Sequence, residues 1–244
     1  MAALAAELVQ LGADVILAGG PEARIAAMKA TSNIPIVAVG GSDPVAEGWA
    51  ASLGRPAGNV TGLTVTYPEL IVKKLELISQ LIPGLSRVAV IRDPNATPPS
   101  VRAAQIAAMR TAASSLRIDV EVIEVRGPAD FDTAFQQAIQ RRRQALNVVE
   151  TPMMFAHRAD IAELARKMRL PTIGEWKLSA NAGFLASYGA DLSDLLRRAA
   201  SHVDKILKGA KPGALPIERP TKFELVIRLW ASLFLNLCCC ARTS

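Results

Sequence analysis

Aromatic residues are scarce, at 5% of the 244 residues, and this scarcity argues against a nucleic-acid-binding surface. Such surfaces combine clustered cations with exposed rings on which bases stack. Here 28 Lys and Arg outnumber 22 Asp and Glu, but the cations are scattered along helical patterns. The densest run, Arg141 to Arg143, falls at an expected helix end, where cations complement the helix dipole. We therefore expect no nucleic-acid partner.

Cysteine and histidine are scarce too, and their positions suit neither a disulfide framework nor a metal site. All three cysteines lie together at positions 238 to 240. The two histidines, His157 and His202, fall in separate helical patterns without a second ligand at metal spacing. Disulfides and zinc sites need their residues spread so that loops can be closed. We expect no bound metal.

The motifs of several enzyme classes are missing as well. The Gly19-Gly20 and Gly40-Gly41 turns lack the G-x-G-x-x-G spacing of dinucleotide sites, and no phosphate loop with Gly-Lys-Ser or Gly-Lys-Thr occurs. No G-x-S-x-G elbow presents a nucleophilic serine. We expect no cofactor. One enzymatic alternative stays open, a small α/β enzyme that uses Glu150 or Glu175 as acid or base.

Long apolar runs are also absent. The apolar tail from Leu229 to Ala241 contains Asn236 and is shorter than the roughly 20 residues that cross a bilayer. Met1 leads directly into an amphipathic helical pattern instead of the cationic and apolar regions of an export signal. We therefore expect neither a membrane-spanning helix nor an export signal in this chain.

What the chain does contain is a regular alternation of short β-branched runs with helical patterns. This alternation predicts an α/β fold with parallel sheets and crossover helices. The expected strands are 14–18, 34–39, 60–65, 87–91, 119–125, 145–149, 171–173, 184–187 and 223–227. The expected helices are 2–11, 22–31, 45–53, 69–81, 100–116, 128–143, 156–168 and 192–207.

Polar residues gather where four of the expected strands end. In open α/β sheets, ligands bind outside the carboxyl ends of the strands, where helix N-termini offer unpaired N–H groups. The relevant loops are 40–44, 92–95, 150–152 and 174–176. Ser42, Asp43, Asn95 and Thr151 could also simply cap the helices that follow them. Because all four loops lie at the carboxyl-end edge of the sheet, they indicate a binding cleft.

The same loops resemble a known family. The stretches Gly41-Ser42-Asp43-Pro44-Val45 and Gly58-Asn59-Val60-Thr61-Gly62 resemble ABC transporter substrate-binding proteins related to those for aromatic amino acids. Further matches, in order and spacing, are Ser187-Tyr188-Gly189, Asp191-Leu192, Arg197-Arg198-Ala199-Ala200, Ile206-Leu207-Lys208-Gly209, Leu215-Pro216 and Pro220-Thr221-Lys222-Phe223-Glu224-Leu225-Val226-Ile227. The resemblance extends from about Leu4 to Ile227.

The resemblance implies two Rossmann-like lobes of the type I periplasmic-binding fold, joined by three crossings and closing on one solute. The resemblance implies that the protein catalyses no reaction. It also implies a small amino acid-like or carboxylate ligand, a permease partner and a periplasmic location. The expected division is 1–66 with 180–214 for the first lobe, 67–179 with 215–228 for the second, and a tail at 229–244. The ligand-binding residues carried over are Gly41, Ser42, Asp43, Asn95, Thr151, Glu175 and Asp191.

Two departures from the family accompany this resemblance. Family members begin with an export signal and a strand, helix and strand before the point where this sequence starts. The family's pattern also stops after Ile227, where an unrelated apolar tail begins. We therefore expect an incomplete first lobe with a gap or exposed edge beside the strands at 14–18 and 34–39, and a fragment without function stays an alternative.

Overall fold

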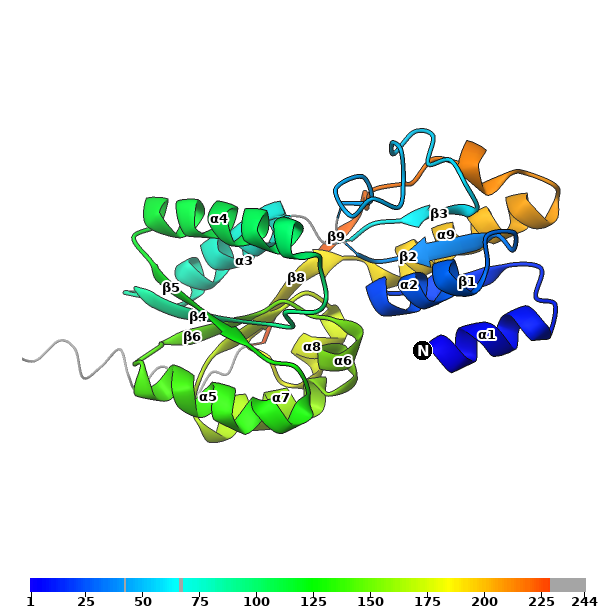
Figure 1. The fold of residues 1–244 in the computed structure, drawn as a ribbon. Coiled ribbons are helices and arrows are strands. Elements are labelled where there is room, and N and C mark those ends of the chain that lie inside the picture. The colour runs from blue at the N-terminus through cyan, green and yellow to red at the C-terminus, as the bar shows by residue number, and fades with distance from the viewer. Residues whose placement is uncertain (42, 66–67, 229–244) are drawn as a thin grey trace, which may run out of the picture.

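The computed structural model of the protein describes residues 1–41, 43–65 and 68–228. It forms two lobes, each with its own sheet between helices, as Figure 1 shows. The first lobe holds three parallel strands in the order β1-β2-β3. The second holds six strands in the order β5-β4-β6-β7-β8-β9, which are parallel except for the antiparallel pair β8 and β9. The expected α/β architecture is confirmed.

The first lobe is built from the beginning of the chain and one later segment. Its early elements are α1 (Ala2–Gln10), β1 (Ile16–Gly19), α2 (Pro21–Ala30), β2 (Ile36–Val39) and β3 (Val60–Leu63). Its later elements are α9 (Leu192–Leu207) and η2 (Pro212–Ala214).

The second lobe takes up the middle of the chain. It begins with α3 (Pro68–Leu81), β4 (Arg87–Arg92), α4 (Pro99–Ser115), β5 (Asp119–Glu124), η1 (Pro128–Asp130) and α5 (Phe131–Gln140). It continues with β6 (Ala145–Val148), α6 (Pro152–Ala156), α7 (Arg158–Lys167), β7 (Thr172–Gly174), α8 (Lys177–Ala182), β8 (Ala186–Ala190) and the returning strand β9 (Phe223–Ile227).

Alternating side chains of the strands pack into two hydrophobic cores in each lobe, one on either face of the sheet. In the second lobe, Ala89 and Ile91 of β4 pack with α5, α6 and α7, whereas Val88 and Val90 pack with α3 and α4 on the other face. In the first lobe, the β2 residues Ile36 and Ala38 face the core beside α2, while Val37 and Val39 face α9. Helices therefore cover both faces of each sheet, as parallel strands require.

The chain crosses between the lobes between residues 65 and 68, at the β8–α9 junction, and just before β9. This differs from the expected division, which assigned residues 180–214 to the first lobe and 215–228 to the second. Residues 186–190 form β8 of the second sheet, and Ile217 packs in the core of the first lobe. The amphipathic pattern of α9 identified the returning helix, but strand pairing, which no local pattern reveals, decides where β8 belongs.

The helix expected at 45–53 is wrong. Residues 44–48 form turns instead, and Gly48 adopts a φ of 77°, a left-handed conformation that helices exclude. Trp49 and Ala50 nevertheless lie buried in the core beside β1 and β2. Buried apolar residues therefore occur here in an irregular segment and not on a helix face.

Several leucines at the edge of the first lobe are exposed. Strands β1 and β2 pair directly, without a gap. Because β1 has no other neighbour among the described strands, it forms an edge of the sheet. Leu17 of this strand is 54% exposed, and Leu4, Leu8 and Leu11 in and after α1 are exposed as well. Within the described residues, no helix is long and apolar enough to cross a membrane.

Candidate functional site

A cavity of about 350 Å³ lies between the two lobes. The first lobe lines it with residues at the carboxyl ends of β1 and β2 and with two leucines of α9. These are Gly19, Gly20, Gly40, Gly41, Leu192 and Leu196. The second lobe lines it from the ends of β4, β6 and β7. The residues there include Arg92, Asp93, Glu150, Thr151, Phe155 and Trp176. The cavity thus occupies the strand-end position at which open α/β sheets bind ligands.

The lobes come close together beside this cavity, at Gly20 and Pro152. Gly20 has a φ of 87°, and a Cβ atom at this residue would lie 2.5 Å from Cγ of Pro152. Gly20 is the N-cap residue of α2 in the first lobe, whereas Pro152 is the first residue of α6 in the second lobe. Only a residue without a side chain fits between the lobes in this arrangement.

Two of the predicted ligand-binding residues line the cavity. Gly41 lines it from the end of β2, and Thr151 from the end of β6. Thr151 also caps α6, because its hydroxyl accepts a hydrogen bond from the Met154 N–H at 3.3 Å. Capping and lining are therefore compatible here, although the sequence presented them as alternatives. Ser42 lies outside the described residues.

Four other predicted residues do not line the cavity. The carboxylate of Asp43 is exposed and accepts hydrogen bonds from the backbone N–H groups of Val45 and Ala46. Asn95 is exposed in the loop after β4, and its backbone N–H donates to Asp93. Glu175 and Asp191, described below, bind other groups of the protein.

Glu175 forms a buried ion pair with Lys74 behind the cavity wall. The Lys74 side chain is fully buried, and its ammonium lies 3.2 Å from Oε1 of Glu175. The same ammonium donates to the backbone carbonyl of Val148, the last residue of β6. A buried charge is costly unless an opposite charge and further hydrogen bonds compensate it. Glu175 therefore holds Lys74 in the core and fastens α3 beneath the ends of β6 and β7.

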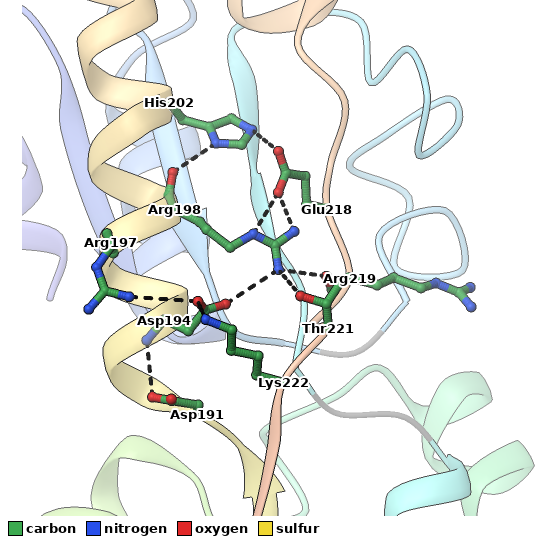
Figure 2. A network of polar contacts seen from close by, with 9 residues as sticks. All are labelled: Asp191, Asp194, Arg197, Arg198, His202, Glu218, Arg219, Thr221 and Lys222. Carbon is green, nitrogen blue, oxygen red and sulfur yellow. Dashed lines mark hydrogen bonds and ion pairs between the residues drawn. The ribbon is translucent and has the colours of Figure 1, made fainter.

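Asp191 belongs to a polar network at the crossings, which Figure 2 shows. Its carboxylate caps α9 by accepting the Asp194 N–H, and its own N–H donates to the carbonyl of Lys222. Asp194 pairs with Lys222 at 2.9 Å, and Arg198 binds Glu218. These contacts tie α9 to the segment that leads into β9. Asp191 thus lies near the crossing, as expected, and acts there as a helix cap.

Glu150 is the acidic residue that joins the cavity to its supporting structure. Its Oε2 accepts hydrogen bonds from the N–H groups of Glu175 and Trp176, and its Oε1 accepts one from the Ser179 hydroxyl. Burial raises the pKa of Glu150 to about 6, against the lowering effect of the hydrogen bond from Ser179. The carboxylate fixes the turn between β7 and α8, and this turn places Trp176 against the cavity.

Aromatic and charged residues that the sequence analysis did not select also line the cavity. Phe155 and Trp176 meet edge to face with ring centroids 6.4 Å apart. Arg92 and Asp93 follow one another at the end of β4, and both are buried. The loop 92–95 was identified from the sequence, but Asn95 was chosen from it. The strand's alternation, which buries Val88 and Val90 on one face, did not show that residues 92 and 93 would both reach the cavity.

Comparison with known proteins agrees with this architecture. The sequence profile of the family described as "ABC transporter substrate binding protein" matches residues 1–238. A protein named "Tyrosine-binding protein" from Clostridioides difficile (strain R20291) is 27% identical over 227 residues, which cover 92% of this chain and 63% of that protein. This chain therefore spans less than two thirds of that relative's length.

Solved structures show the same fold. The ABC domain from Streptococcus pneumonia in complex with L-Trp matches with a TM-score of 0.84 at 21% identity, covering 97% of this chain and 80% of the other. A conserved domain protein from Vibrio cholerae O1 biovar eltor matches with a TM-score of 0.82 at 25% identity, covering 93% and 74%. The expected type I periplasmic-binding fold is confirmed.

Replacement of Lys74 by Met should destabilise the protein by about 3–5 kcal/mol, because Glu175 would be left as an uncompensated buried charge. The matched control is Lys73→Met, whose solvent-exposed pair with Glu76 should change the free energy of unfolding very little. Chemical denaturation measures both. Combining Lys74→Met with Glu175→Gln should recover part of the loss, since the two residues interact. Equal effects of the two lysine substitutions would contradict this role.

Stability should also depend on pH through Glu150. Its pKa in the folded protein, about 6, lies above the ordinary value of 4.5, so protonation favours the folded state. This contribution is complete below about pH 4.5, is lost as the pH rises through about 6, and amounts to about 2 kcal/mol. The unfolding free energy of the wild type, relative to Glu150→Gln, should fall by that amount between about pH 4.5 and 7.5.

The control for this titration is Glu163→Gln. Glu163 is paired with Arg166, whose hydrogen bond lowers the pKa of the carboxylate, so its pH dependence has the opposite sign. Denaturant titrations of the wild type, Glu150→Gln and Glu163→Gln at about pH 4.5 and 7.5 measure the two opposite pH dependences. A difference between wild type and Glu150→Gln that does not change with pH would show that Glu150 does not titrate in this range.

Proposed function

The chain belongs to the family of ABC transporter substrate-binding proteins, and we propose that it captures a small amino acid or related carboxylate between its lobes. The single observation that carries this proposal is the cavity lined from both lobes by strand-end residues. Its volume, about 350 Å³, lies within the range of roughly 300–1,000 Å³ that is typical of small-molecule sites. Tyrosine and L-Trp, named for two similar proteins, support this ligand class.

The enzymatic alternative with Glu150 or Glu175 finds less support in the geometry. Glu175 is bound to Lys74 and does not line the cavity. Glu150 does line it, but both of its carboxylate oxygens accept hydrogen bonds from the protein's own N–H and hydroxyl groups. A general acid or base needs a carboxylate oxygen within hydrogen-bond reach of the reacting group. Binding without turnover is the function that this arrangement favours.

On this proposal the protein works in the periplasm and delivers its ligand to a membrane permease. Type I binding proteins close two lobes around a solute by bending at the crossings. The contact between Gly20 and Pro152 supports a closed arrangement of the lobes in this structure. A closed form that differs from the open form gives a permease a surface by which to recognise the loaded protein.

Isothermal titration calorimetry of the full chain against amino acids, organic acids and sugars tests the proposal. We expect saturable 1:1 binding of at least one amino acid or carboxylate and no binding of sugars. Binding should also change tryptophan fluorescence, because Trp176 lines the cavity, and Trp176→Phe should remove most of this change. Binding of sugars alone, or of nothing in the panel, would overturn the proposed ligand class.

The Gly20→Ala substitution should weaken ligand binding by about tenfold to a hundredfold, because overpacking of 1–3 kcal/mol would oppose closure. The added methyl group would meet Pro152 Cγ across the cleft. Gly12→Ala is the matched control, since Gly12 also has a positive φ but has nothing within 4 Å of the added atom. Calorimetry should show near-normal affinity for this control.

A second substitution tests whether the contact with Pro152 causes the loss of affinity. Combining Gly20→Ala with Pro152→Ala removes Cγ and Cδ and leaves a Cβ atom 3.9 Å away, an ordinary contact distance. This double variant should regain most of the lost affinity. If Pro152→Ala does not restore binding, the loss comes from backbone strain at Gly20 and not from the contact between the lobes.

A further inference from the structure

Arg92 is a buried cation that lines the cavity. It is the last residue of β4 and is 4% exposed. Burial lowers the pKa of Arg92, as does the nearby charge of Arg102. Removing a guanidinium from water is unfavourable unless an anion and a full set of hydrogen bonds replace the water. The protein should therefore provide an anionic partner, or leave that role to a ligand.

The charges of Glu124 and Asp93 lie near enough to raise the pKa of Arg92, but neither carboxylate is bonded to Arg92 in the part of the chain that the structure describes. Arg92 makes no ion pair there, and its Nη2 donates to two neutral groups, Oγ1 of Thr97 at 3.1 Å and Oε1 of Gln105 at 3.4 Å. Its Nε is buried without any hydrogen-bond partner. A guanidinium presents its N–H groups in a planar fork that binds a carboxylate with two parallel hydrogen bonds. Arg92 thus has an unused donor beside the cavity that it lines.

Asp93, the next residue, supplies the opposite charge. It is 5% exposed and also lines the cavity. Its Oδ1 accepts the N–H of Asn95 at 2.8 Å, and Oδ2 accepts no hydrogen bond from the residues that the structure describes. Glu150, the other acid at the cavity, already accepts three hydrogen bonds from the protein. Asp93 is therefore the acidic residue with an oxygen left for a ligand.

We propose that the cavity binds a zwitterionic α-amino acid, with its carboxylate on Arg92, its ammonium on Asp93, and an apolar or aromatic side chain. This inference rests on the proposed function and assigns the ligand's orientation within it. The two charges of an α-amino acid are separated by one carbon atom, which suits two consecutive residues of opposite charge. The side chain lies among the apolar residues that line the rest of the cavity, Leu17, Val39, Val65, Phe155, Trp176 and Leu192.

Three ligands that differ by one charged group test the assignment on the wild-type chain. L-tryptophan has both groups, tryptamine lacks the carboxylate, and indole-3-propionate lacks the ammonium. L-tyrosine, tyramine and 3-(4-hydroxyphenyl)propionate form a second series. Calorimetry should show each amino acid binding at least about tenfold tighter than its two analogues, since each lost charged hydrogen bond weakens binding by about that factor or more.

Variants then assign each charge to its residue. Arg92→Gln should weaken binding of the amino acid and of its analogue without an ammonium group by about tenfold to a hundredfold. Binding of the analogue without a carboxylate should stay unchanged. Asp93→Asn should weaken binding of the amino acid and of its analogue without a carboxylate, and should leave binding of the analogue without an ammonium group unchanged. Arg92→Lys keeps the charge without the fork and should retain part of the affinity. Arg102→Gln is the control, because this nearby arginine does not line the cavity and donates to the Pro94 carbonyl.

The outcomes separate this inference from the proposed function. If the wild type binds an amino acid but Arg92→Gln weakens all three members of a series equally, the orientation is overturned while the proposed function stands. If the wild type binds the amine as tightly as the amino acid, Arg92 does not bind a carboxylate, and this result needs no variant to fold. If the wild type binds neither L-tryptophan nor L-tyrosine, this inference fails, and the proposed function fails with it only when no other amino acid or carboxylate of the calorimetric panel binds.

Discussion

The carboxylate of Glu150 is the group on which the second lobe's side of the cavity depends. It stands just beyond β6 and receives hydrogen bonds from two consecutive backbone N–H groups after β7 and from Ser179 in α8. These donors compensate a buried charge, and in return the charge fixes the turn that carries Trp176. Directly behind this turn, Lys74 pairs with Glu175 and donates to the end of β6. Two buried carboxylates and one ammonium therefore join α3, β6, β7 and α8 at the cavity.

The first lobe is fastened in a different way, by partly exposed charges and backbone contacts at the crossings. The segment 215–218 is bonded to β3, because Thr61 donates to the carbonyl of Leu215 and the Glu218 N–H donates to that of Gly62. Arg198 and Asp194 of α9 then bind Glu218 and Lys222 (Figure 2). The last crossing is therefore held to the first lobe until residue 222. On the proposed closure, bending in these two crossings would fall at the junctions with β8 and β9.

The sequence predicted the strands well, because each short β-branched run became a strand within a few residues of its expected position. It also predicted that polar loops at the strand ends would form the cleft, as Gly41 and Thr151 do. It could not show which residue of a loop turns inward. In the loop after β4, Asn95 carries the typical turn signal, yet Arg92 and Asp93 reach the cavity while Asn95 faces solvent.

Glu175 illustrates a second limit of the sequence. Its position after β7 suggested a ligand contact, but its carboxylate points to Lys74, a residue 101 positions away in the sequence. Lys74 lies on the apolar face of its helix, three residues after Ile71 and four before Ile78, but the helical pattern does not show which carboxylate would pair with it. Such pairs depend on how helices pack on the sheet, which local patterns do not encode.

These two buried acids also determine which charges remain available to a ligand. Glu175 is paired with Lys74 and does not line the cavity, and both carboxylate oxygens of Glu150 already accept hydrogen bonds from the protein. The adjacent Arg92 and Asp93 are left with incomplete hydrogen bonding at the cavity. Because their charges are opposite, the cavity favours a ligand that is neutral overall but carries both charges close together. An anion without an ammonium group would satisfy Arg92 and leave Asp93 unpaired, which is the physical basis for discrimination among carboxylates.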